Sequence, residues 1–581
     1  MTRIRPLWRT VLAPAVAALC TGCAAIGPDA PAFPHAVVAA DHIIASRAGA
    51  EMLRKGGNAV DAAVATSFAL SVTRPYSCGI GGGGFMVIHF NDDPVHGTRS
   101  IALNYRETAP AAVGPDYFVN ADDPSASTLG GRAVGVPGNV AGLLYALEHF
   151  GTLDRQTVLA PAIRAAEHGF EADENYVSTA RSVAARFDEH PEFKRRFAYV
   201  WTAFLHGGEI RVGDLVRLPE QAAALRLIAE HGREAFYEGA IADAIVRAVQ
   251  ADGGSMTHDD LRTYRVRQTQ PLTFQFASWR FLAMPPPSSG GVAMAQTLGL
   301  FTRHLAATRG RPSSSAMFVH ALTEALKHAF ADRAEWLGDP DFVDVPIDQL
   351  LDRASLDAMA ATFDPARTHE PGAYGSRAPP PDDRGTSHYC VVDANGNAVA
   401  ATETINLSFG SKLPVPEFGF CLNNQLDDFT ALPGVPNAFG LTQSDRNLPA
   451  PGKRPLSSMS PTIVLDADGR VVIVAGAAGG PTIITSTLEI ILEVLLSDST
   501  AAEAMNASRF HHQWAPDVLY MEPEWFEVRD AAGVLIVDHL RAMGHRVQRR
   551  ESIAAANLIR RSARGWDASG DPRKGGVPAG Y

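Results

Sequence analysis

The sequence predicts an α+β fold in which helices and antiparallel sheet alternate along one long chain. Apolar residues recur at helical spacing in several segments, apolar runs of strand length separate these segments, and an Asn-Gly turn joins two of the runs. The chain of 581 residues is 46% apolar and 20% charged, which is typical of a globular protein with a sizeable core. No Pro/Ser-rich or charged linker separates two halves, so both a few domains and one large intertwined unit fit this length.

An apolar strand and two helices are predicted first. Residues 35–40 form an apolar run of strand length, and residues 43–55 have apolar side chains at helical spacing before Gly56-Gly57. Asn58 is a suitable N-cap for a second helix that extends to Ser71. Further helical patterns cover residues 133–194, 222–250, 316–337 and 485–505, and further strand-like segments are residues 84–90, 100–105, 388–393, 398–406, 462–466 and 470–475.

Two hairpins are predicted in the C-terminal third. If Asn395 and Gly396 are the central turn residues of the first hairpin, Thr386 lies opposite Ile405. A register change of one residue would place Thr404 or Asn406 there instead. Ala467-Asp468-Gly469 is the turn of the second hairpin. Antiparallel sheet is therefore expected near residues 386 and 460.

The charge balance argues against a nucleic-acid partner. The chain has 51 Lys and Arg against 63 Asp and Glu, a formal charge of −12. Phosphate binding requires clustered positive charge, which this composition does not favour.

The N-terminus has the pattern of an export signal. Arg3, Arg5 and Arg9 precede an Ala-rich apolar stretch that ends near Leu19, which indicates a signal peptide over residues 1–25. Cys20 and Cys23 belong to this stretch. The local pattern resembles a lipoprotein cleavage box with Cys23 as the lipidated residue, and plain cleavage near Ala24 or Ala25 is the alternative. We therefore expect a periplasmic or extracellular protein, which is lipid-anchored only in the first of these two cases.

Common catalytic motifs and metal motifs are absent from the sequence. It contains no G-x-S-x-G, no H-E-x-x-H and no P-loop. Only five cysteines occur, so no disulfide framework is expected. The glycine run of residues 79–84 indicates tight backbone packing, and His511-His512 are interpreted as structural because no partner lies at ligand spacing. We expect neither a metal nor a cofactor.

A series of polar segments distinguishes the region from residue 385 to residue 480. Each segment alone would be a turn or a cap: residues 385–388, Thr404 with Asn406, residues 423–429, 455–461 and 476–480. Together and in this order they resemble the gamma-glutamyltransferase family of N-terminal-nucleophile hydrolases. Residues 56–65, 81–85, 106–110 and 571–576 extend the resemblance over most of the chain. The resemblance implies an αββα sandwich of four layers, two antiparallel sheets between helices.

The resemblance also implies that the chain is a precursor that cuts itself between Gly385 and Thr386. Residues 34–385 would form a large subunit and residues 386–581 a small catalytic subunit, the two making one intertwined heterodimer. Thr386 would be the nucleophile, and its freed α-amino group, with an ordinary pKa of ~7.7 to 8.0, can serve as the base. His388 is then a structural neighbour, and Gly385 would let the backbone bend for the attack.

The remaining site residues are implied by the same resemblance. Thr404 would steady the nucleophile, and Gly479 and Gly480 would supply the N–H groups of an oxyanion hole. Asp428 is preferred over Asp427 because strand alternation sends neighbours to opposite faces and the resemblance to the family falls on the second of the two. The donor's α-carboxylate would be bound by Arg106, Ser457 and Ser458, and its α-amino group by Asn406, Gln425 and Asp428.

A lid is expected over residues 433–452. Phe439 stands there where some relatives carry Tyr, and Ser387 stands where many relatives have Thr. Such a loop would cover the bound glutamyl group and exclude water.

The activity implied is that of a gamma-glutamyltransferase with glutathione hydrolase activity. Thr386 would form a γ-glutamyl ester from glutathione or a related donor, and water or an amino-acid or peptide amine would resolve it. Two alternatives stay open: a β-lactam side-chain acylase of the same family, and a non-catalytic exported binding protein. Arg106 and Asp428 argue against the first, because they suit a zwitterionic end that such side chains need not have.

Overall fold

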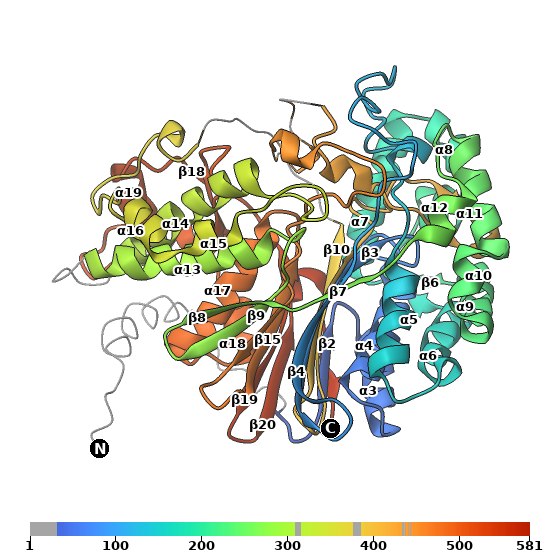
Figure 1. Ribbon diagram of the computed structural model, residues 1–581, viewed down its shortest axis with the longest axis horizontal. Coiled ribbons are helices and arrows are strands. Elements are labelled where there is room, and N and C mark those ends of the chain that lie inside the picture. Colours follow the sequence, from blue (N-terminus) through green and yellow to red (C-terminus); the bar gives the residue numbers. More distant parts are fainter. Residues whose placement is uncertain are drawn as a thin grey trace.

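Two seven-stranded antiparallel sheets form the centre of the molecule, and helices cover the outer face of each (Figure 1). The computed structural model describes residues 32–307, 315–375, 385–432, 435, 437–439, 441 and 443–581. Sheet I has the order β21-β2-β10-β11-β3-β4-β7, and sheet II has the order β1-β20-β19-β15-β14-β9-β8. The predicted four-layer αββα arrangement is therefore present.

The strands of the two sheets have the following bounds. Sheet I consists of β21 (Ala579–Gly580), β2 (Val37–Ala40), β10 (Thr386–Val392), β11 (Ala398–Thr404), β3 (Gly83–Asp93), β4 (Gly97–Tyr105) and β7 (Arg267–Thr269). Sheet II consists of β1 (Ala32–Phe33), β20 (Gly565–Gly570), β19 (Ala555–Ser562), β15 (Val471–Ala478), β14 (Thr462–Leu465), β9 (Trp279–Ala283) and β8 (Leu272–Phe276).

One helical layer covers each sheet. The layer on sheet I is built mainly from α3 (Ile43–Arg54), α4 (Ala59–Thr73), α5 (Asn139–Phe150), α6 (Arg155–His168), α7 (Glu174–Glu189), α9 (Pro219–His231), α10 (Arg233–Tyr237) and α11 (Ala240–Ala251). The layer on sheet II is built mainly from α13 (Gly290–Ala307), α14 (Ser315–Trp336), α17 (Thr482–Ser497), α18 (Ala501–Asn506) and α19 (Ile536–Ala542). The predicted helices near residues 43–55, 58–71 and 316–337 are confirmed, and Asn58 caps α4 with a capping box. The helical pattern of residues 485–505 is divided between α17 and α18.

Side-chain alternation along the strands separates two apolar cores. On β2, Val38 and Ala40 pack against the helices outside sheet I, whereas Val37 and Ala39 face sheet II. Strand β10 divides in the same way, with Tyr389 and Val391 outside and Cys390 and Val392 between the sheets. Buried on both faces, β10 is held rigidly, which fixes the position of its first residue, Thr386.

The register of the first hairpin differs by one residue from the register that a two-residue turn at Asn395-Gly396 would give. Thr386 pairs with Thr404, not with Ile405. The backbone N–H of Asp393 donates to Asn397 O at 3.0 Å, which leaves a three-residue loop, and Gly396 has a φ of 82°. A three-residue loop with a left-handed glycine adds one residue to the turn and shifts every pair.

Several expectations concern residues outside the described part of the chain. The predicted signal peptide with Cys20 and Cys23 lies wholly outside it. Of the predicted lid, residues 433, 434, 436, 440 and 442 also lie outside. Within the described part, no helix is both long and apolar enough to span a bilayer.

Candidate active site

Thr386 begins β10 at a point where one of the two neighbouring strands has ended. Its pairing with β11 starts at Thr386, whereas its pairing with β2 starts only at Tyr389. The side of Thr386 away from β11 is therefore free of sheet partners. There the ammonium of Lys574 donates to Thr386 O and, at 3.1 Å, to Ser387 Oγ, while it forms an ion pair with Asp41 at 2.9 Å.

The hydroxyls of Thr386 and Thr404 meet at the carbonyl of Gly385. Thr386 Oγ1 donates to Gly385 O at 2.8 Å and lies 3.2 Å from Thr404 Oγ1. Thr404 Oγ1 donates to the same carbonyl at 2.5 Å, and it accepts from the backbone N–H of Asn406 at 2.7 Å. The nucleophile predicted from the sequence is thus beside the peptide bond that it would cut, with a second hydroxyl polarising that bond.

Close packing, not an unusual φ, requires glycine at position 385. A Cβ there would lie 2.3 Å from Asn406 O and 2.6 Å from the carbonyl carbon of Leu407. This steric requirement for glycine stands beside the expected one, a backbone bend during the attack, which stays a prediction. Asn406 itself has a φ of 78°, a left-handed conformation that asparagine tolerates.

Gly479 and Gly480 connect β15 to α17 beside Thr386. Both have positive φ, 138° and 58°. Gly479 and Thr386 both line a cavity of about 110 Å³. Gly480 and Thr386 both line a second cavity. Both glycines therefore share a cavity wall with the nucleophile, just before the N-terminal end of α17 where the helix dipole favours negative charge. This location fits an oxyanion hole.

Arg106 and Asp428 form a buried ion pair. Arg106 Nη2 donates to Asp428 Oδ2, and the guanidinium also donates to Pro455 O and Leu456 O at 3.2 Å each. The Arg106 side chain is 1% exposed and that of Asp428 is 12% exposed. The two residues predicted for opposite ends of a donor zwitterion are thus paired with each other in its absence.

The segment that carries Asp428 is a 3-10 helix, Gln425–Asp428, and not a strand. The expected strand alternation is therefore wrong, although the two aspartates do point to different partners. Asp427 accepts from Ser127 Oγ at 2.7 Å and from the N–H of Ala438 at 2.9 Å, so it anchors the loop after residue 432. Burial raises the pKa of Asp427 to about 7.

Ser457 and Ser458 are held by Arg333, a residue that sequence reasoning missed. Arg333 lies on α14, and its Nη2 donates to Ser458 Oγ at 3.4 Å. Its Nε donates to Ser289 Oγ at 2.9 Å, and Ser289 Oγ donates to Ser457 O at 2.7 Å. No local motif marks Arg333, because arginine in a helical segment is usually a solvated side chain.

The cavity at these residues is small and has unsatisfied polar groups of both kinds. Its volume is about 20 Å³, room for little more than one water molecule. Gln425 Oε1, an acceptor, and Arg333 Nη1, a donor, are buried without a hydrogen-bond partner among the described residues. All of the following residues line it: Arg106, Arg333, Thr386, Thr404, Asn406, Gln425, Asp428, Phe439, Ser457, Ser458 and Gly480. An unpaired acceptor and an unpaired donor in one cavity complement an ammonium and a carboxylate.

Glu107 adds a second buried carboxyl behind Arg106. It is fully buried, neither of its oxygens has a hydrogen-bond partner among the described residues, and its Oε2 lies 3.8 Å from Arg106 Nη1. Desolvation raises the pKa of Glu107 to about 8, despite the nearby guanidinium. Glu107 is thus mainly neutral at pH 7 and does not neutralise Arg106. The positive charge of Arg106 is therefore available to pair with Asp428 and with a bound donor.

The three histidines considered in the sequence analysis, His388, His511 and His512, make structural contacts. His388 Nδ1 is bonded to Thr402 Oγ1 at 2.8 Å and Nε2 to Cys390 Sγ at 3.2 Å, and burial lowers its pKa to about 3. His511 contacts Thr485 and Gln513, and His512 pairs with Asp517 at 3.2 Å. None of these contacts involves Thr386.

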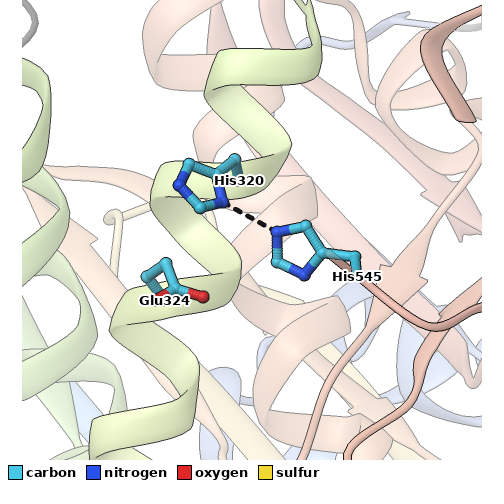
Figure 2. Close-up of side chains that lie close together, drawn as sticks. All are labelled: His320, Glu324 and His545. Carbon is cyan, nitrogen blue, oxygen red and sulfur yellow. Dashed lines mark hydrogen bonds between the residues drawn. The ribbon is translucent and has the colours of Figure 1, made fainter. Parts of the chain in front are cut away.

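A buried cluster of potential metal ligands lies elsewhere, on α14 and before β18 (Val547–Arg549) (Figure 2). His320 Nδ1 is bonded to His545 Nε2 at 2.7 Å, and Glu324 accepts from Thr368 and Tyr374. Lys327 lies 3.7 Å from Glu324. Because the ligand atoms are already bonded and an ammonium stands beside them, the cluster is satisfied as a hydrogen-bond network.

Comparison with known proteins gives a consistent result. The sequence model of the family described as gamma-glutamyltranspeptidase matches residues 45–581. A glutathione hydrolase proenzyme of Escherichia coli (strain K12) is 38% identical over 548 residues, 89% of this chain and 92% of that protein. A glutathione hydrolase proenzyme of Pseudomonas sp. (strain A14) is 39% identical over 490 residues, 84% of this chain and 83% of that protein.

A solved structure supports the fold separately. The cephalosporin acylase from Bacillus halodurans has a TM-score of 0.81 to this chain at 23% identity, covering 96% of this chain and 97% of its own. That likeness concerns the fold alone. The family match spans the segments that hold Arg106, Thr386 and Gly480, and on this basis the chain belongs to the gamma-glutamyltranspeptidase family.

Proposed function

We propose that this protein transfers the γ-glutamyl group of glutathione and related donors to water or to an amino-acid or peptide amine. The main support is one juxtaposition: the Thr386 hydroxyl lies beside both the Gly385 carbonyl and a cavity with groups for an α-amino acid zwitterion. The names of the E. coli and Pseudomonas relatives, glutathione hydrolase proenzymes, agree with this activity.

In the first reaction the chain matures. Thr386 Oγ attacks the Gly385 carbonyl carbon, an ester replaces the peptide bond, and the Thr386 nitrogen becomes a free amine. Water then hydrolyses the ester. The products are a large subunit that ends at Gly385 and a small subunit of residues 386–581, which stay together as a heterodimer because strands of both belong to each sheet.

In the second reaction the same hydroxyl attacks the γ-amide carbonyl of the donor. The α-amino group of Thr386 takes the hydroxyl proton and passes it to the leaving amine. Gly479 and Gly480 stabilise the oxyanion, and Arg106, Ser457 and Ser458 hold the α-carboxylate. Asn406, Gln425 and Asp428 surround the α-ammonium. Water or an acceptor amine then attacks the γ-glutamyl ester.

The cavity must enlarge before a donor can bind. About 20 Å³ cannot hold a glutamyl group, and Phe439 of the loop after residue 432 contributes to its wall. We propose that this loop is a lid that opens for the donor and closes over the ester.

Turnover of purified protein tests the proposal. Release of glutamate from glutathione, and formation of a γ-glutamyl dipeptide when glycylglycine is added, are the expected results, with both absent in Thr386→Ala. Hydrolysis of glutaryl β-lactam donors without turnover of glutathione would instead support the acylase alternative. An intact single chain that binds glutamate without turnover would support the binding-protein alternative.

We also propose that the chain is exported and that its lipid, if it carries one, is on Cys23. Cell fractionation tests export. Mass spectrometry of the mature N-terminus distinguishes lipidated Cys23 from cleavage near Ala24 or Ala25.

A further inference from the structure

Arg333 is a buried cation at the donor cavity with no carboxylate partner among the described residues. Its side chain is 2% exposed. Two of its nitrogens donate to hydroxyls, Nε to Ser289 and Nη2 to Ser458, and Nη1 donates to none of the described groups. Burying a guanidinium is costly, and here the burial lowers the pKa of Arg333 to about 10, although the charge of Asp428 opposes this shift.

Arg106, the arginine expected from the sequence to bind the donor's carboxylate, is already largely occupied. Its bonds go to Asp428, Pro455 O and Leu456 O. A carboxylate that entered the cavity could therefore gain only part of the hydrogen bonding of Arg106. Arg333, on the other hand, lines the same cavity, has an unused donor, and feels the charge of Asp428 without forming an ion pair with it.

We propose that Arg333 is a second guanidinium that binds the α-carboxylate of the donor directly, through Nη1. The ligand class is an α-amino acid end group whose carboxylate lies between Arg106 and Arg333 beside Ser458. This inference rests on the proposed γ-glutamyl transfer and extends it, since it makes selectivity for the α-carboxylate depend on two guanidinium groups.

A merely structural role for Arg333 would have a different signature. If it only positioned Ser458 directly and Ser457 through Ser289, removing it would weaken the binding of carboxylate donors only through these two serines. It would also have little further effect once Ser458 had lost its hydroxyl. Both roles predict a loss confined to donors that have the α-carboxylate, but only direct binding predicts that this loss persists in Ser458→Ala.

The test compares Arg333→Met with the unmutated enzyme on γ-glutamyl-p-nitroanilide and on its α-carboxamide. We expect kcat/KM to fall about 10- to 100-fold for the carboxylate donor and by less than about 3-fold for the carboxamide. The same selective loss is expected when Ser458→Ala is the background. Arg454→Met is the matched control: Arg454 is also buried, also has an unpaired nitrogen, and does not line the cavity.

An equal loss for both donors, or a loss that disappears in the Ser458→Ala background, would overturn the inference. If Arg333→Met does not fold and mature, Arg333→Lys is used to test the inference. This variant keeps the positive charge but lacks the planar guanidinium with its two terminal nitrogens. The inference then requires a reduced preference for the carboxylate donor, and an unchanged preference overturns it. An unmutated enzyme inactive on γ-glutamyl-p-nitroanilide would refute the proposed function itself, which is a distinct result.

Discussion

The hydroxyl of Thr404 donates to the carbonyl oxygen of Gly385 at 2.5 Å. This carbonyl belongs to the peptide bond that Thr386 would cut. The backbone N–H of Asn406 donates in turn to Thr404 Oγ1, which turns the hydroxyl proton of Thr404 towards the carbonyl. A donor fixed in this way stabilises the negative charge that develops on the oxygen during attack.

Thr404→Val should therefore slow self-cleavage. Loss of one such donor costs about 10²- to 10³-fold in rate for oxyanion holes, and a similar slowing is expected here because the valine keeps the shape without the hydroxyl. A time course of precursor and fragments on denaturing gels measures the rate. Thr404→Ser is the control and should cleave at close to the normal rate. Equal cleavage by the valine variant would show that the Thr404 hydroxyl is not used.

Asp428→Asn should abolish most turnover of γ-glutamyl donors, whereas Asp427→Asn should mainly loosen the loop that contains Ala438. The reason is that Asp428 lies on the cavity with Arg106, while both oxygens of Asp427 are bonded to Ser127 and Ala438. Losing the charge partner of an ammonium should cost about 2 to 4 kcal/mol in kcat/KM. The measurement compares both variants on one γ-glutamyl anilide. A larger defect in Asp427→Asn would require a different site for the ammonium.

The raised pKa of Glu107 predicts that the free energy of unfolding depends on pH. Its pKa is raised from 4.5 to about 8, so the folded protein holds a proton that the unfolded chain releases above pH 4.5. The stability that this group contributes is fully present below pH 4.5 and is lost as pH rises towards 8, at most ~3 to 5 kcal/mol in total. Glu107→Gln cannot ionise, so its melting temperature should fall less than that of the unmutated enzyme between pH 5 and pH 8. Parallel melting curves for both proteins would contradict the raised pKa.

Gly480→Ala should disturb the lid. A Cβ at position 480 would lie 2.5 Å from Phe439 Cδ1, so the phenylalanine ring must move. We expect a higher KM for γ-glutamyl donors, and partial recovery in Gly480→Ala/Phe439→Ala because the second change makes room. Steady-state kinetics of the single and double variants decides this. If the double variant is no better than the single one, the damage comes from the left-handed backbone at position 480 and not from the ring.

Local signals predicted most of the fold and many positions around the site. Helical spacing and the Asn58 cap located α3 and α4, and the Asn-Gly turn brought Thr386 to the 404–406 region. The exact register depended on whether the loop has two or three residues, which the sequence leaves open. The strand expected at Asp428 was wrong: this buried segment forms a 3-10 helix in which Asp427 and Asp428 bond to Ser127 and Arg106, partners far along the chain that local preference does not reveal.

Arg333 could not be found from the sequence for a related reason. Its role depends on Ser289 and Ser458, which are 44 and 125 residues away along the chain. Nothing in the local pattern of α14 distinguishes it from a solvated arginine. Only the packing of α14 against the Ser457–Ser458 segment shows that its side chain is buried at the cavity.

The most direct test of the central claim is N-terminal sequencing of the smaller fragment of the purified protein. If Thr386 is the nucleophile of both maturation and turnover, the fragment begins Thr-Ser-His-Tyr, and Thr386→Ala stays a single inactive chain. A fragment that begins elsewhere, or a Thr386→Ala variant that still separates into two fragments, would contradict the account.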